Sequence, residues 1–223
     1  AGVRVNKGFA VSAKLDAPVL VDDLGFEKGV KVSRLARLAM EGRDTEIASI
    51  AGGVELPSSS LDLAMAQVVK LRVGADITGE EALDLTLEAG KKLIAMGASA
   101  AAALPHIAKG FDLEMLDAVV VTDPSVAKVR DQDGNTVLHR MFEVAGRDFA
   151  AENADTNRFM HVSTISEGLL EEVETFASLK KLASVRNKAG QTPAEVFFRA
   201  ALEVRDAAIE SVRPAAKKSS LSM

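Results

Sequence analysis

Few side chains in this 223-residue chain are of the kinds that carry out chemistry. The chain has no cysteine, which rules out disulfides, thiol nucleophiles and thiolate metal ligands. Its three histidines, His106, His139 and His161, are too few and too scattered for a histidine-rich metal site. The acidic and amide side chains between Asp148 and Asp155 lack the spacing and the closing glutamate of a calcium-binding loop. We therefore expect a solvated loop there, and no metal ion.

The glycines and serines match no cofactor or catalytic motif. The sequence contains neither Gly-Lys-Ser/Thr nor Gly-x-Gly-x-x-Gly, the patterns that cradle phosphates. The serine run at 58–60 precedes an expected helix, so it reads as a loop plus an N-cap. No Gly-x-Ser-x-Gly elbow and no Ser/His/Asp set can be assembled. The sequence thus predicts no cofactor and no enzymatic activity.

Composition and charge restrict the partners. The net charge is −5 and the isoelectric point is about 5.4. Because the chain is acidic and has no basic cluster before its C-terminal end, we do not expect it to bind nucleic acid. The longest apolar stretch, Ala98–Leu104, is far shorter than a membrane span, and no signal peptide opens the sequence. We expect no membrane contact and a cytoplasmic location. Abundant alanine, with no Trp or Tyr, favours closely packed small helices over a β-sandwich.

Two turns with the same pattern must position whatever site exists. Residues 130–139 and 187–194 each contain an Asp/Asn-x-x-Gly-x-Thr segment. The glycines, Gly134 and Gly190, occupy the position at which a tight turn needs a positive φ. Thr136 and Thr192 follow at a helix N-cap, where a hydroxyl accepts from a free backbone N–H. Both turns are therefore expected to lead directly into a helix.

These turns, each followed by apolar residues at helical spacing, resemble the start of an ankyrin repeat, in which Thr-Pro-Leu-His follows a β-turn. The most specific copy is Asp133–His139, where Val137 replaces the usual proline; in the second copy Glu195 stands at the histidine position. The resemblance covers about residues 33–205, strongly in two repeats and loosely elsewhere. It implies that His139 is structural and ties neighbouring turns together by hydrogen bonds.

The resemblance implies an all-α fold, an ankyrin-like helical-hairpin solenoid with degenerate N-terminal repeats and a helical insertion. Residues 1–30, with extended-looking valines, are expected to form an N-terminal arm or cap. The repeat domain is then 31–212, and 213–223 is a disordered tail. The turn glycines lie 56 residues apart (190 − 134), well beyond one repeat of about 33, which places an insertion at about 147–182.

Within the repeat domain, two segments beginning at Leu61 and Leu83 resemble each other, each ending in a glycine. Each is either a shortened repeat or one long helix with a glycine terminator, and the sequence leaves both open. Further helices are expected after a Ser33 N-cap, at about 165–182 and at 193–212, with Gly146 starting an irregular piece.

The implied function is protein–protein binding through the concave face formed by turns and first helices. On this face we place the variable positions of the two clear repeats: Gln132, Asp133, Asn135, Glu143, Lys188, Gln191 and Arg199. One alternative is that the repeats are a scaffold within a larger catalytic or effector protein, which in the effector case is exported to a host cell. Another is a helical regulator or chaperone unrelated to ankyrin.

Overall fold

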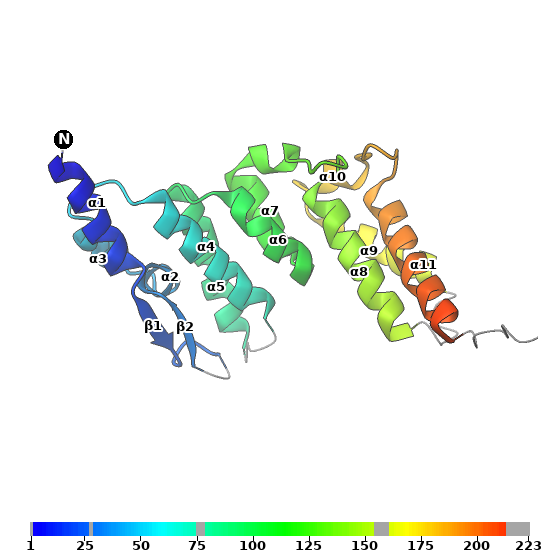
Figure 1. Ribbon diagram of the computed structural model, residues 1–223, viewed down its shortest axis with the longest axis horizontal. Coiled ribbons are helices and arrows are strands. Elements are labelled where there is room, and N and C mark those ends of the chain that lie inside the picture. Colours follow the sequence, from blue (N-terminus) through cyan, green and yellow to red (C-terminus); the bar gives the residue numbers. More distant parts are fainter. Residues whose placement is uncertain (1, 27–28, 75–78, 154–160, 213–223) are drawn as a thin grey trace, which may run out of the picture. The chain divides into compact units, whose positions relative to one another are not determined.

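A computed structural model describes residues 2–26, 29–74, 79–153 and 161–212 (Figure 1). Most of these residues are helical, which confirms the all-α prediction apart from one small hairpin. The chain divides into two compact units, residues 1–131 (unit 1) and 132–223 (unit 2), rather than the single repeat domain that was expected. The expected disordered tail, 213–223, lies outside the described residues.

The first 30 residues are not a separate extended arm. Gly2–Leu15 form helix α1, in which Val11 and Leu15, one turn apart, are buried. The strands β1 (Pro18–Val21) and β2 (Val30–Ser33) then pair antiparallel, with Val19 opposite Val32. Because this hairpin joins residues on both sides of position 30, the boundary predicted there is wrong.

Ser33 begins the next helix, as expected. Its hydroxyl accepts from the N–H of Ala36 at the start of α2 (Arg34–Met40), while its own N–H donates to the Gln67 side chain. After Gly42, with φ +69°, the chain continues into α3 (Asp44–Ala51), which Gly52 ends in the left-handed conformation.

The two similar segments are single long helices rather than shortened repeats. They form α4 (Ser58–Val73) and α5 (Glu80–Ala95), followed by α6 (Ala100–Gly110), α7 (Leu113–Thr122) and the short 3₁₀ helix η1 (Pro124–Lys128). Helix α4 packs against α5 and α6, and α5 packs against α7. The buried stripe of α4 has helical spacing and consists of Leu61, Ala64, Met65, Val68, Val69 and Arg72. The serine run lies inside the first turn of α4, after Pro57, instead of forming a loop.

Unit 2 is built on two helices that lie side by side, α8 (Val137–Asn153) and α11 (Pro193–Val212) (Figure 1). Between them come α9 (Val162–Thr175) and α10 (Lys180–Ala183), so the single helix expected over 165–182 is interrupted. The shared core holds the buried rings of Phe142 and Phe197, with centroids 6.5 Å apart edge to face.

Helix α8 does not end at Gly146 as predicted but runs on to Asn153. Asp148 and Asn153, which were assigned to a solvated loop, are therefore helical, and the Asn153 amide donates to the Phe149 carbonyl of the same helix. Residues 154–160, including Asp155, lie outside the described part.

Candidate functional site

The two predicted turns lie against each other in unit 2. Gly134 and Gly190 have φ values of +77° and +78°, the left-handed conformation expected from the sequence. The backbone N–H of Lys188 donates to the Asp133 carbonyl at 2.9 Å, and the Lys188 ammonium donates to the Gln132 carbonyl at 2.7 Å. The turns are thus paired by hydrogen bonds although 56 residues of sequence separate their glycines (190 − 134).

An amide chain strengthens this pairing. The Asn187 Nδ2 donates to the Asn135 Oδ1 at 2.9 Å, and the Asn187 Oδ1 accepts from the Gln191 backbone N–H at 2.9 Å. Asn135 is only 7% exposed. Its side chain is therefore buried at the junction of the two turns instead of being exposed on the expected binding face.

His139 makes the link implied by the ankyrin resemblance. Its ring is fully buried, and its Nδ1 lies 3.2 Å from the Thr136 N–H and 2.9 Å from the Thr136 hydroxyl. Because a backbone N–H can only donate, Nδ1 must accept, and the ring proton sits on Nε2. Nε2 then donates to the Gln191 carbonyl at 2.9 Å. Both ring nitrogens are occupied in holding the turns, so His139 is not available as a general base.

Thr192 opens the second helix with a reciprocal cap. The Glu195 carboxylate accepts from the Thr192 N–H at 2.6 Å, and the Thr192 hydroxyl accepts from the Glu195 N–H at 3.4 Å. The Thr192 N–H, then the nearby Arg186, lower the pKa of Glu195 below its ordinary value of 4.5. Glu195 occupies the position that corresponds to His139. It caps its own helix, whereas His139 links the two turns.

A pH prediction follows from this lowered pKa. In the folded state Glu195 holds its proton less tightly than in the unfolded state, so its stabilising effect is present above about pH 4.5 and is lost as the pH falls through the lower, folded pKa. We expect Glu195→Gln to lower stability most at neutral pH, where the wild-type carboxylate is ionised, and to flatten the acid side of the stability–pH curve. Urea unfolding followed by circular dichroism between pH 3 and pH 7 measures this, and identical slopes for both proteins would contradict it.

The turn glycines give a second prediction. Gly134 and Gly190 share the same φ, but a Cβ on Gly134 would lie 3.0 Å from the Lys188 backbone nitrogen, whereas a Cβ on Gly190 would meet nothing within 4 Å. Gly190→Val should cost about 1–3 kcal/mol from backbone strain alone, and Gly134→Val should cost more. Thermal unfolding compares them, and a wild-type midpoint for Gly134→Val is the contrary result.

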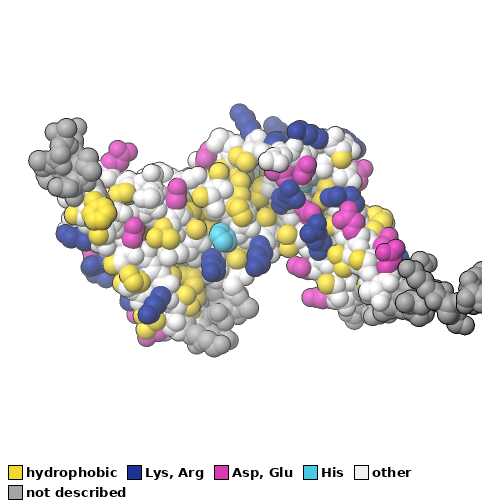
Figure 2. All heavy atoms as spheres, in the orientation of Figure 1, with side chains coloured by type: hydrophobic (Ala, Val, Ile, Leu, Met, Phe, Trp, Pro, Cys, Tyr) yellow, Lys and Arg dark blue, Asp and Glu magenta, His cyan; other side chains and the backbone are white. Residues whose placement is uncertain are grey.

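Around the paired turns lies an open hollow of about 500 Å³. Six of the seven predicted positions line it, and Gln132 adjoins it through the carbonyl that binds Lys188. The lining also includes residues that were not predicted. The full lining is Asp133, Asn135, Arg140, Glu143, Asn187, Lys188, Ala189, Gln191 and Arg199. In the space-filling view, basic and acidic side chains are interspersed over unit 2 (Figure 2).

The acidic charges of this hollow are engaged within it. The Glu143 carboxylate, 12% exposed, accepts from Arg140 at 2.6 Å and from Arg147 at 2.8 Å, and Arg140 also lies 3.8 Å from the Asp133 carboxylate. The sequence could have predicted these ion pairs, because Arg140 and Arg147 stand three and four residues from Glu143 on one helix.

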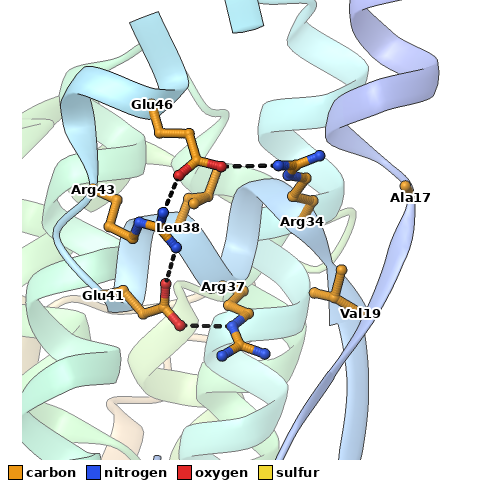
Figure 3. A pocket seen from close by; sticks show the side chains of 8 residues that line it. All are labelled: Ala17, Val19, Arg34, Arg37, Leu38, Glu41, Arg43 and Glu46. Carbon is orange, nitrogen blue, oxygen red and sulfur yellow. Dashed lines mark hydrogen bonds and ion pairs between the residues drawn. The ribbon is translucent and has the colours of Figure 1, made fainter. Parts of the chain in front are cut away.

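Unit 1 has a second, smaller hollow of about 240 Å³ that sequence reasoning missed (Figure 3). Its wall is a row of alternating charges: Arg34 bonds to Glu46, Arg43 bonds to both Glu46 and Glu41, and Arg37 bonds to Glu41. The Glu41 carboxylate raises the pKa of Arg37. Each carboxylate accepts from two guanidinium groups, so this row is satisfied internally and joins α2, α3 and β1.

No group of three or more His, Asp or Glu side chains that could hold a metal ion occurs among the described residues. His106 is half-buried and His161 is exposed at the start of α9. No described helix combines the length and the apolar character needed to cross a bilayer.

Comparison with known proteins identifies no relative: no family model matches the sequence, and no curated protein or solved structure is significantly similar to it.

Proposed function

We propose that this chain is an ankyrin-like protein-binding module and that unit 2 contacts its partner through the hollow around the paired turns. One observation carries the proposal: two Gly turns far apart in sequence lie against each other, so that equivalent positions of the two repeats surround one surface. Glu143 and Arg199 illustrate this, since each stands nine residues after its turn glycine (143 − 134 and 199 − 190) and both line the hollow.

The packing of unit 1 supports a repeat architecture in a looser form. Each long helix there packs on the next and on the one after it, α4 on α5 and α6, and α5 on α7. Neighbour-on-neighbour packing is the arrangement from which helical solenoids are built. Unit 1 would then contain the degenerate repeats.

A binding role suits the residues better than catalysis. The buried histidine is committed to the turns through both ring nitrogens, and the hollow is lined by amides, lysine, arginine and paired carboxylates. Such side chains recognise another polar surface without a nucleophile and base being required. The protein partner would be met in the cytoplasm, or in a host cell if the chain is an exported effector.

Site-specific photo-cross-linking tests this function. A benzoylphenylalanine at Ala189, an exposed lining residue, should yield a discrete adduct with a protein from the source cells. The matched control is Glu210, exposed near the other end of α11, which lies about 25 Å along the helix from Pro193. Adducts from neither position, or equally from both, would contradict a binding surface at the turns.

A further inference from the structure

Two cations of the unit 2 hollow, Lys188 and Arg199, are exposed and are not fully paired with carboxylates. Lys188 is exposed, and its ammonium donates to the neutral Gln132 carbonyl. No carboxylate of the described residues lies within ion-pair distance of this ammonium. Arg199, 43% exposed on its side chain, reaches a carboxylate through a single nitrogen, to Glu203 at 3.3 Å. Both groups keep donors directed at solvent.

The Glu143 carboxylate, in contrast, has little capacity left. Both oxygens of Glu143 accept from arginines, and its side chain is 12% exposed. Asp133 is 77% exposed on its side chain and has Arg140 at 3.8 Å. The lining therefore holds three cations, Arg140, Lys188 and Arg199, against two carboxylates, each of which lies within ion-pair distance of an arginine.

An amide donor lies in the same lining. The Gln191 Oε1 is the acceptor for the Asn187 amide at 3.5 Å, which leaves the Gln191 Nε2 without an acceptor among the described residues. Guanidinium, ammonium and amide N–H groups together match a carboxylate, which has acceptor positions only and forms its stronger hydrogen bonds with charged donors.

The negative charge of unit 2 gathers elsewhere. Helix α9 carries four glutamates, Glu167, Glu171, Glu172 and Glu174, and no lysine or arginine. The four glutamates have no cationic partner among the described residues, whereas the hollow exposes Lys188 and Arg199. The two surfaces thus favour partners of opposite charge.

We propose that the hollow recognises an acidic segment of the partner protein, with Lys188 and Arg199 each contacting an Asp or Glu side chain and Gln191 donating a further hydrogen bond. This inference rests on the proposed protein-binding function and adds the chemistry of the partner. It makes binding dependent on salt, because exposed charge pairs are screened at ionic strengths near 0.15 M and above.

Peptide selection on the full chain tests it. A random twelve-residue display library is panned against the wild type, a Lys188→Glu/Arg199→Glu variant, and a Lys180→Glu/Lys181→Glu variant. The last is the matched control, because it makes the same change in net charge at two exposed lysines of α10 outside the hollow. The wild type and the control should enrich peptides rich in Asp and Glu, and the hollow variant should enrich basic ones.

The strongest acidic peptide is then measured by fluorescence anisotropy. It should bind the hollow variant at least tenfold more weakly than the wild type and the control, and its Asn/Gln counterpart should bind the wild type just as weakly. Equal losses in both charge variants would overturn the inference, since only long-range charge would then be at work. So would enriched peptides without acidic residues.

The two proposals fail differently. If Ala189 cross-links to a partner but the selected peptides show no acidic preference, the binding surface stands and its proposed chemistry is wrong. If no adduct forms at Ala189 and no peptide is enriched, both proposals fall.

Discussion

Replacing Gly146 with alanine is expected to destabilise unit 2 by about 2 kcal/mol or more, although alanine is the better helix former. Gly146 is inside α8 at the point where the helix passes α11. A Cβ there would lie 2.4 Å from the Phe197 carbonyl oxygen and 3.1 Å from its Cα. Because these are backbone atoms of a packed helix, the contact can be relieved only by separating α8 from α11, which loosens the Phe142–Phe197 core.

Gly168 provides the matched control, because it is also helical, is exposed in α9, and has nothing within 4 Å of its would-be Cβ. Gly168→Ala should stabilise by about 0.5–1 kcal/mol through helix propensity. The two substitutions are chemically identical, so their opposite signs isolate the helix contact.

Urea unfolding followed by circular dichroism measures both variants, and hydrogen exchange locates the effect. Peptides from α8 and α11 should lose protection in Gly146→Ala, while peptides from α4 and α5 in unit 1 keep it. If Gly146→Ala were as stable as the wild type, the close approach of the two helices would be wrong.

Gly146 also shows why part of the fold was beyond sequence reasoning. A glycine inside an apolar helical pattern reads equally as a terminator or as a site of close packing. Which reading holds depends on Phe197, 51 positions later in the sequence (197 − 146), and no local pattern reports that contact.

The turns, by comparison, were predictable because their determinants are local. A positive φ at Gly134 and Gly190 and the threonine caps follow from residues within a few positions of each other. The repeat resemblance then placed the lining residues near one another, since equivalent positions of neighbouring repeats lie side by side.

The burial of Asn135 was not predictable in the same way. It depends on the Asn187 amide of the other turn. Aligning the two turns predicts that they are neighbours, but it does not predict which of their side chains form hydrogen bonds. The charged row of unit 1 was partly visible, because Arg37–Glu41 and Arg43–Glu46 have helical spacing. Their convergence on one hollow depends on the packing of α2 against α3 and has no sequence signal.

The second large effect is expected at Arg72, a buried charge in unit 1. Its side chain is 4% exposed, and its Nε donates to Asp112 at 2.6 Å. Its Nη1 donates to the Leu83 carbonyl at 2.6 Å, and its Nη2 donates to Glu114. These bonds join the end of α4 to α5 and to the start of α7. No sequence pattern predicted these contacts, because Asp112 stands 40 residues away (112 − 72).

Arg72→Met should destabilise the protein by about 3 kcal/mol, within the range of 3–5 kcal/mol found when one partner of a buried ion pair is removed. Methionine keeps most of the packing volume. The loss of stability therefore measures chiefly the cost of leaving the Asp112 carboxylate, which is 11% exposed, without its cation. The lower end of the range is appropriate because the other oxygen of Asp112 still accepts from the Met115 N–H and caps α7.

Two further variants separate charge from packing. Arg34→Met removes an exposed arginine, 44% exposed, from a single pair with Glu46 and should cost no more than about 1 kcal/mol. Arg72→Met combined with Asp112→Asn removes both buried charges while the asparagine oxygen can still cap α7, so it should recover part of the loss. Urea unfolding gives all four free energies. If Arg72→Met cost no more than Arg34→Met, the Arg72–Asp112 pair would not be what holds the end of α4 to the start of α7. The same would follow if the double variant were no more stable than Arg72→Met alone.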